Sequence, residues 1–516
     1  MTACATRDKI DENVRVCNLI LPVPDTDFCD FLKEVDQLSK FAPEIIALIE
    51  KDMDCYAQKK KSLRLADRKF FESNMDDLPE MDIKERNVLA GELRLAVGRP
   101  RMPGYAVYVF LMIRGFLGSL TSKPARRFLR ESMSLYGFLQ DRGLTMPATT
   151  TILQNVNLIS HETLELIFDK LISLIIEQEL DDFNTLTIDS TSVKADSAWP
   201  TDSMIITGLL TRVSRLGQKF HFFGLKNFSQ GWVPRRLKKM ENLDFQINLV
   251  AGKANSKSKL KKHYRELLKQ GRKAADALTV QFNALEQSVS LEMYAPSRRA
   301  FLQQVMSQIR TDLSDVEHVL EYTDDRVFHN KTLPAKEKVL SLSDGSAAYI
   351  KKGDRNPVIG YKPQLVRSEN GFVTSLIVPQ GNAADCSKLI PSIFESIRRT
   401  GIVPEWVSTD DGYASTKGRD GVLEMGVKNI SISGSKGRKL TTPEKWDSDI
   451  FKDARRNRSA VESLMFTIKD GFEFGEVSRR GLESVQDELL EKVLAYNCCR
   501  IVLMKKRRRE KLDKVI

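Results

Sequence analysis

The chain has 516 residues, more than the roughly 250–300 that one hydrophobic core usually supports, so we expect two or three domains. Its 80 lysines and arginines outnumber its 69 aspartates and glutamates, and the net charge of +11 favours polyanionic partners, although solubility alone would also explain it. The longest apolar run, 105–113, is shorter than the ~20 residues of a membrane span, and the N-terminus lacks a signal-peptide pattern, so we expect a cytoplasmic protein without membrane contact.

Residues 1–92 have the apolar spacing of amphipathic helices and no catalytic grouping, which predicts an N-terminal helical arm. Residues 93–180 predict a second all-helical domain. Its exposed cations, among them Arg126 and Arg127, favour a helix-turn-helix-like module that contacts DNA. The alternative is a helical bundle that only packs against the next domain.

The first strand of a core domain is predicted within residues 181–204. Polar and apolar side chains alternate over 185–189, the period of a strand, and Asp189 stands at its end, where a carboxylate reaches solvent and metal. Asp196 and Asp202 follow in a loop and are secondary candidates.

Residues 205–335 predict an inserted antiparallel helical hairpin with a coiled-coil-like seam in its second arm. The first arm is strongly basic. This charge fits either a solvated helix face or an arm that follows phosphates. The basic residues are Lys257, Lys259, Lys261, Lys262, Arg265, Lys269, Arg272 and Lys273.

Residues 336–500 predict the remainder of the core. Asn370-Gly371 separates two strand patterns and predicts a hairpin, with positive φ angles in the turn. A helix ending at Gly401, a strand leading to Asp410, a short helix, another strand and a long helix after Pro443 follow.

This order predicts an α/β RNase H-like core: a mixed sheet of three antiparallel strands followed by alternating helices and parallel strands. In such a sheet Asp189 and Asp410 end neighbouring strands, and Glu462 lies on the helix that covers them. Three carboxylates in one cluster suit a hard divalent cation such as Mg²⁺, with Mn²⁺ as a substitute.

The last core helix carries Arg458, Glu462 and Lys469 at positions i, i+4 and i+11. At ~100° per residue these three side chains fall within about 40° of one another, so one face offers a carboxylate and two cations for a phosphate. An ordinary i,i+4 ion pair would explain Arg458 and Glu462 alone.

These motifs resemble the DDE transposases of bacterial insertion sequences, over roughly residues 95–500. Arg458, Glu462 and Lys469 have the spacing of the Arg-Glu-Lys part of that group's Tyr-Arg-Glu-Lys signature, whereas Arg455 stands where the tyrosine would be. In WVSTDDGY the resemblance selects Asp410 rather than its neighbour. The DST and PTDS segments and the Gly-Arg-Pro-Arg run at 98–101 are similar to the ISNCY-type group.

The resemblance implies a transposase that binds insertion-sequence ends and catalyses metal-dependent cleavage and strand transfer on double-stranded DNA. It implies a two-metal site held by Asp189, Asp410 and Glu462, a homo-oligomer (a dimer) on DNA, and a bacterial, nucleoid-associated location. A basic tail at 501–516 adds candidate contacts. The candidate DNA-binding residues are Arg458, Lys469, Arg455, Arg126, Arg127, Lys505 and Arg507.

Two other functions fit the same residues. One is a nuclease of the same fold that cleaves DNA without strand transfer. The other is a transposase-derived DNA-binding regulator without chemistry, which the presence of all three carboxylates argues against.

Overall fold

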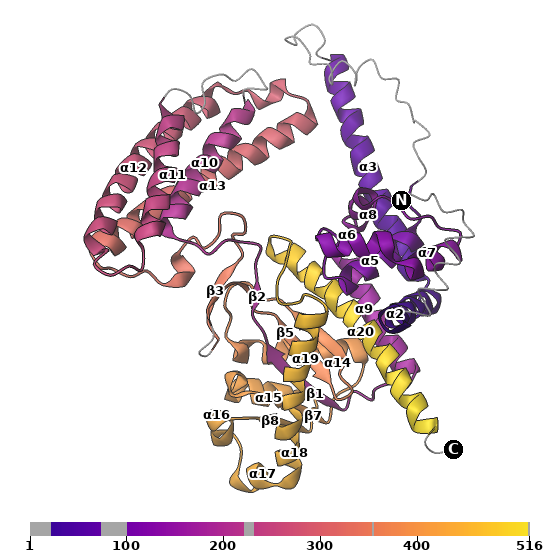
Figure 1. The fold of residues 1–516 in the computed structure, drawn as a ribbon. Coiled ribbons are helices and arrows are strands. Elements are labelled where there is room, and N and C mark those ends of the chain that lie inside the picture. The colour runs from indigo at the N-terminus through magenta and orange to yellow at the C-terminus, as the bar shows by residue number, and fades with distance from the viewer. Residues whose placement is uncertain (1–21, 74–100, 221–231, 353–355, 514–516) are drawn as a thin grey trace. The chain divides into compact units, whose positions relative to one another are not determined.

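A computed structural model describes residues 22–73, 101–220, 232–352 and 356–513 (Figure 1). The predicted arm at 1–92 is therefore described only in part, and the predicted basic run at 98–101 lies outside the described residues except for Arg101. The chain forms two compact units. The first comprises Met1–Tyr56, Pro100–Asp196 and Ile350–Ile516, and the second comprises Ala57–Arg99 and Ser197–Tyr349.

A mixed sheet forms the centre of the first unit. Its strands in the described part of the chain are β1 (Thr185–Ser190), β5 (Gln364–Ser368), β6 (Val373–Ile377), β7 (Trp406–Thr409) and β8 (Asn429–Ile432). They lie in the order β6-β5-β1-β7-β8. β6, β5 and β1 are mutually antiparallel, whereas β7 and β8 run parallel to β1. This mixed five-stranded sheet fits the predicted RNase H-like core.

The predicted hairpin joins β5 to β6 through Asn370 and Gly371. Gly371 has a φ of 93°, but Asn370 is not among the residues with positive φ, so only one of the two expected left-handed residues is present. Two further short strands, β2 (Val193–Lys194) and β4 (Val358–Tyr361), pair antiparallel beside the sheet. β3 (Ala348–Ile350) lies where the chain passes from one unit to the other.

Helices cover both faces of the sheet. On one face Leu186 and Ile188 of β1 pack with buried residues of α14 (Leu389–Thr400) and α15 (Thr416–Glu424). On the other face α18 (Asp449–Asn457) contacts β7 and β8, and α19 (Ser459–Gly471) contacts β1. Asp189 is therefore only 9% exposed, although it belongs to the polar face of its strand.

The sequence predicts one unbroken helix after Pro443, and this prediction is wrong. The segment forms α17 (Pro443–Asp447), α18 and α19, and the breaks lie at Ser448 and Arg458. Ser448 accepts a hydrogen bond from the N–H of Phe451, so its side chain starts a new helix there. The short α16 (Ser435–Lys439) precedes this group.

The helices of residues 101–177 belong to the same unit as the sheet. They are α5 (Gly104–Phe116), α6 (Lys123–Glu131), α7 (Met133–Gln140), α8 (Thr149–Val156) and α9 (His161–Glu177). The apolar run at 105–113, for which the sequence predicts a buried helix, forms α5. The sequence also predicts one helix over 122–140 and another over 147–180, but each of these segments is divided into two helices. Ser132 and Ser160 accept hydrogen bonds from backbone N–H groups of Leu135 and Thr163, which begins α7 and α9 at those points.

Long helices complete the unit. α2 (Pro22–Phe41) and α20 (Leu482–Asp513) pack together, and α20 also packs on α5 and α9 (Figure 1). Gly115 permits the close approach of α5 to α20, because a Cβ atom there would lie 2.1 Å from the carbonyl oxygen of Glu491. α3 (Glu44–Ser73) begins in this unit and ends in the other.

The second unit contains a bundle of four long helices in its described residues. These are α10 (Asp202–Gln218), α11 (Val233–Val250), α12 (Lys257–Ser288) and α13 (Pro296–Phe328). The predicted hairpin corresponds to α12 and α13, but α10 packs against both of them and α11 packs against α12 and α10, so the element is a bundle rather than a two-helix arm. The seam predicted in α13, from Leu302 to Leu320, is buried in its core.

Candidate active site

Two aspartates lie side by side at the ends of adjacent parallel strands. Thr187 of β1 is in register with Ser408 of β7, and Asp189 and Asp410 each follow two residues later. Neighbouring strands are about 4.8 Å apart, so this register brings the two carboxylates into one electrostatic neighbourhood. Burial, followed by the negative charge of Asp189, raises the pKa of Asp410 above its usual value.

Asp411 has a separate structural contact. Its carboxylate accepts hydrogen bonds from the backbone N–H groups of Lys436 and Gly437, at 2.8 and 3.1 Å, and thereby caps α16. Asp410 accepts only the local N–H of Gly412, at 2.9 Å, among the described residues. The side chain of Asp410 is thus the more available of the two for a ligand.

Lys352, which no sequence pattern marks as a site residue, forms an ion pair with Asp189. The Nζ atom of Lys352 lies 3.2 Å from Oδ1 of Asp189 and 3.1 Å from Oγ of Ser190, and it also donates to the carbonyl oxygen of Ser190. No pattern around Lys352 marks it in the sequence, because its partner lies 163 residues earlier.

A fourth carboxylate, Asp385, lies behind the pair. A Cβ atom built on Gly412 would lie 3.0 Å from Oδ1 of Asp410 and 3.2 Å from Oδ2 of Asp385, which places both near one point. Burial opposes ionisation of Asp385, but hydrogen bonds from Lys362 and Gln364 outweigh it and lower the pKa of this carboxyl. Asp385 is therefore already paired within the chain.

Helix α19 presents the three residues predicted to share a face. Arg458 lies at its first turn as the N-cap, and its guanidinium is 3.4 Å from Oε1 of Glu462. Lys469 in the last turn donates to the carbonyl oxygen of Ser192, at 3.0 Å, beyond the end of β1. The Glu462 side chain is 67% exposed, so the Arg458 contact is a surface ion pair.

One open cavity of about 970 Å³ brings these side chains together. Its lining includes the three predicted carboxylates and the two predicted cations, although they come from β1, the end of β7 and α19. These residues are Asp189, Asp410, Glu462, Arg458 and Lys469.

The carboxylates share this cavity without forming a closed ion site. Among the described residues no three acidic, histidine or cysteine side chains are close enough together to hold one metal ion. Two of the three carboxylates are paired with cations of the chain, Asp189 with Lys352 and Glu462 with Arg458. An all-oxygen donor set nevertheless fits a hard divalent cation, and the Lys352 ammonium shows that the place beside Asp189 accepts positive charge.

The other predicted DNA contacts differ in their availability. Arg455 is engaged within the chain: its guanidinium lies 4.0 Å from the ring centroid of Trp446 and donates to the Trp446 carbonyl oxygen. Lys505 pairs with Glu34 of α2, at 2.7 Å. Arg126 and Arg507 are exposed, and exposed Arg127 pairs with Glu131.

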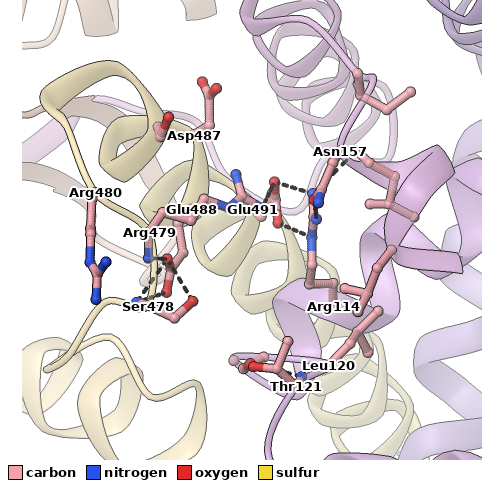
Figure 2. A pocket seen from close by; sticks show the side chains of 16 residues that line it. Arg114, Leu120, Thr121, Asn157, Ser478, Arg479, Arg480, Asp487, Glu488 and Glu491 are labelled. Atoms are coloured by element: carbon pink, nitrogen blue, oxygen red, sulfur yellow. Dashed lines mark hydrogen bonds and ion pairs between the residues drawn. The ribbon is translucent and has the colours of Figure 1, made fainter. Parts of the chain in front are cut away.

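A second cavity of the same unit, of about 440 Å³, contains a buried ion network (Figure 2). Figure 2 shows Arg114 of α5 facing Glu491 of α20, and two nitrogen atoms of Arg114 each lie 2.7 Å from a carboxylate oxygen of Glu491. Arg479 donates to the same carboxylate. This network joins the helical segment to the core and leaves its charges mutually paired, so we assign it to structure.

Residues 319–498 match the family model described as "Transposase DDE domain", a span that contains Asp410, Glu462 and β5–β8 but not Asp189. The match supports a DDE transposase, an enzyme class that acts in DNA transposition. Searches of curated proteins and of solved structures return no match. No helix in the described residues has the length and apolarity that crossing a membrane requires.

Proposed function

We propose that this protein is a DNA transposase that binds the ends of an insertion sequence, cleaves DNA there in a metal-dependent reaction, and joins the ends to target DNA. The observation that carries the proposal is the cavity in which Asp189, Asp410 and Glu462 meet Arg458 and Lys469. Two strand ends supply Asp189 and Asp410, and α19 supplies Glu462 together with the two cations, which is an arrangement for holding a phosphate near a metal site.

Asp189, Asp410 and Glu462 would hold Mg²⁺ or Mn²⁺. The bound ions supply a polarised phosphate, an activated water or 3′-hydroxyl nucleophile, and stabilisation of the leaving oxygen. Asp189 is held by the sheet on both sides, in register with Leu365 of β5 and beside β7. Its position is therefore rigid, which suits a residue that fixes the geometry of the reacting phosphate.

Two side chains change partners in this proposal. To hold a cation together with Asp410, Asp189 would have to exchange its contact with Lys352, and Glu462 its contact with Arg458. The released Arg458 and Lys352 then face the cavity as cations, and together with Lys469 they bind the phosphates flanking the scissile bond. The Arg458–Glu462 exchange costs little, because the Glu462 side chain is 67% exposed. The Asp189 side chain is buried, so a cation that binds it has to replace the charge of Lys352.

Among the DDE transposases, we assign the protein to the ISNCY-type group with the Tyr-Arg-Glu-Lys signature. The spacing of Arg458, Glu462 and Lys469 supports this assignment. Joining two element ends requires two active sites, so the working form is a dimer on DNA. Arg455 stands in the place of the signature tyrosine, and its stacking on Trp446 joins α18 to α17.

The test uses a labelled duplex carrying the inverted repeats that flank the coding region, with a supercoiled target plasmid and Mg²⁺. The wild-type chain should give cleaved ends and joined product, and Asp189→Asn should give neither while still binding the duplex. Cleavage without any joined product would assign the protein as a nuclease. Sequence-specific binding with no cleavage, unchanged by Asp189→Asn, would assign it as a regulator.

A further inference from the structure

Helix α12 in the second unit has two opposite faces of contrasting chemistry. Its buried face packs into the bundle through Leu267, Ala274 and Leu278. At ~100° per residue, the exposed face directly opposite carries six cations within about 120° of arc. These cations are Lys261, Lys262, Arg265, Lys269, Arg272 and Lys273.

The charge of this face is not neutralised by the helices around it. Only Arg272 among the six forms an ion pair within the described residues, with Asp324 of α13 at 3.3 Å. The neighbouring α13 carries six acidic residues, so acidic partners exist in the bundle, but Asp312 pairs with Arg212 and Asp325 with Lys331 instead. Asp276 is the one acid of α12 within the same arc, and it lies beyond Lys273 at the C-terminal end of the stripe, so the stripe from Lys261 to Lys273 is wholly basic.

A groove lies between this face and the end of α13. It has a volume of about 450 Å³, and its lining contains four cations and one acid, Asp324, which pairs with Arg272. The lining residues are Arg265, Leu268, Lys269, Arg272, Lys273, Asp324, Phe328 and His329. The guanidinium of Arg265 lies 5.4 Å from the ring centroid of Phe328, a distance at which a cation and an aromatic face attract each other. The groove thus combines a hollow, converging cations and a ring that holds one of them in place.

The length of the face matches a run of phosphates. Lys261 and Lys273 are separated by twelve positions, or about 18 Å along an α-helix. One DNA strand advances about 3.4 Å per nucleotide along the duplex axis, so the face spans about five phosphates.

We propose that this face of α12 is a DNA backbone-binding surface, separate from the candidate active site and independent of base sequence. Lysine contacts with phosphate position a duplex without reading it, because the ammonium group recognises charge rather than base edges. This inference rests on the proposed function, since it supplies a second contact of the same chain with DNA.

The test measures binding of the full chain to a 40-base-pair duplex of arbitrary sequence, in EDTA, over a series of salt concentrations. The variant is Lys262→Gln, Lys269→Gln and Lys273→Gln combined. The matched control removes three exposed lysines of the same unit outside α12, as Lys253→Gln, Lys331→Gln and Lys336→Gln combined. All six side chains are exposed, so we expect both variants to keep the thermal unfolding midpoint of the wild type.

The α12 variant should bind more weakly by about 10- to 100-fold near 0.1 M salt, and its plot of log K against log salt should be shallower by about 2 to 3, or about 0.9 for each lost phosphate contact. The control should keep the wild-type slope. If log K falls with log salt equally steeply for the α12 variant and for the control, the inference is overturned. So would a loss of binding to vesicles of anionic phosphatidylserine with no change for DNA.

The two proposals are separable by these results. If the wild type cleaves element ends and the α12 variant binds DNA with the wild-type slope, only the inference about α12 fails. If the α12 variant shows a shallower salt dependence of DNA binding but the wild type never cleaves, α12 binds DNA in a protein without the proposed chemistry. A wild type that binds no duplex overturns both.

Discussion

The Nζ atom of Lys352 lies 3.2 Å from Oδ1 of Asp189, so a cation of the chain itself occupies the place beside the acid at the end of β1. The same ammonium contacts both oxygens of Ser190, which fixes it at this strand end. A divalent cation that binds Asp189 must compete with this contact.

Lys352→Met should therefore raise the affinity of the protein for Mn²⁺ by several-fold, because the metal no longer displaces an ammonium group. The measurement is calorimetric titration of the full chain with Mn²⁺ in the absence of DNA. Lys351→Met removes the neighbouring exposed lysine and should leave the affinity unchanged. Weaker Mn²⁺ binding by Lys352→Met would show that the lysine supports the site instead of competing for it.

The adjacent aspartates 410 and 411 should differ in what they contribute. Asp410→Asn should reduce metal-dependent cleavage of element ends by at least about 100-fold with little change in stability, because its carboxylate faces the cavity. Asp411→Ala should retain cleavage but lose about 0.5–2 kcal/mol of stability, because it removes the cap of α16. Cleavage assays and urea unfolding of both variants check this, and an inactive Asp411→Ala beside an active Asp410→Asn would reverse the assignment.

Arg114 should matter for stability and not for chemistry. Arg114→Met leaves the buried Glu491 carboxylate with Arg479 as its remaining partner, and breaking one side of a buried ion pair costs about 3–5 kcal/mol. The matched control is Arg127→Met, which removes an exposed ion pair with Glu131 and should cost less than about 1 kcal/mol. Urea unfolding compares the two, and equal effects would mean that the network in Figure 2 adds no net stability.

Glu488 should make the stability of the protein depend on pH in the acid range. Burial alone would raise the pKa of Glu488, but the Lys492 ammonium and the backbone N–H groups of Ser478 and Arg479 outweigh it and lower that pKa. A lowered folded-state pKa means that this stabilisation is present above the unfolded-state value of about 4.3 and disappears as pH falls through the folded-state value.

Glu488→Gln should accordingly be less stable than the wild type at pH 7, and the difference should shrink as pH falls below about 4. Urea unfolding at a series of pH values measures this difference. Glu483→Gln changes an exposed glutamate of the same helix and should show no such trend. A difference that stays constant from pH 7 to pH 3 would contradict the contribution of the Glu488 charge.

Local pattern predicted the strands of the five-stranded sheet and their order along the chain, but it missed β2 and β3 and did not separate β4 from β5. β1, the β5–β6 hairpin, α14 with its end at Gly401, and β7 all form where the alternation of side chains and the turn residues predict them. These signals are local, because a strand or a turn is recognised from residues a few positions apart. Helix breaks at Ser132, Ser160 and Ser448 were missed, because a side-chain cap overrides a continuing apolar pattern.

The amino-acid sequence by itself determined the two aspartates at strand ends, the Arg458–Glu462–Lys469 spacing and the basic stripe of α12. Only the tertiary structure decided the partner of each charge: Lys352 for Asp189, α16 for Asp411 and Trp446 for Arg455. The physical reason is the sequence separation over which each signal acts. Periodicity acts between neighbouring residues, whereas an ion pair or a cap depends on the distance between side chains that the packing of the sheet and its helices brings together.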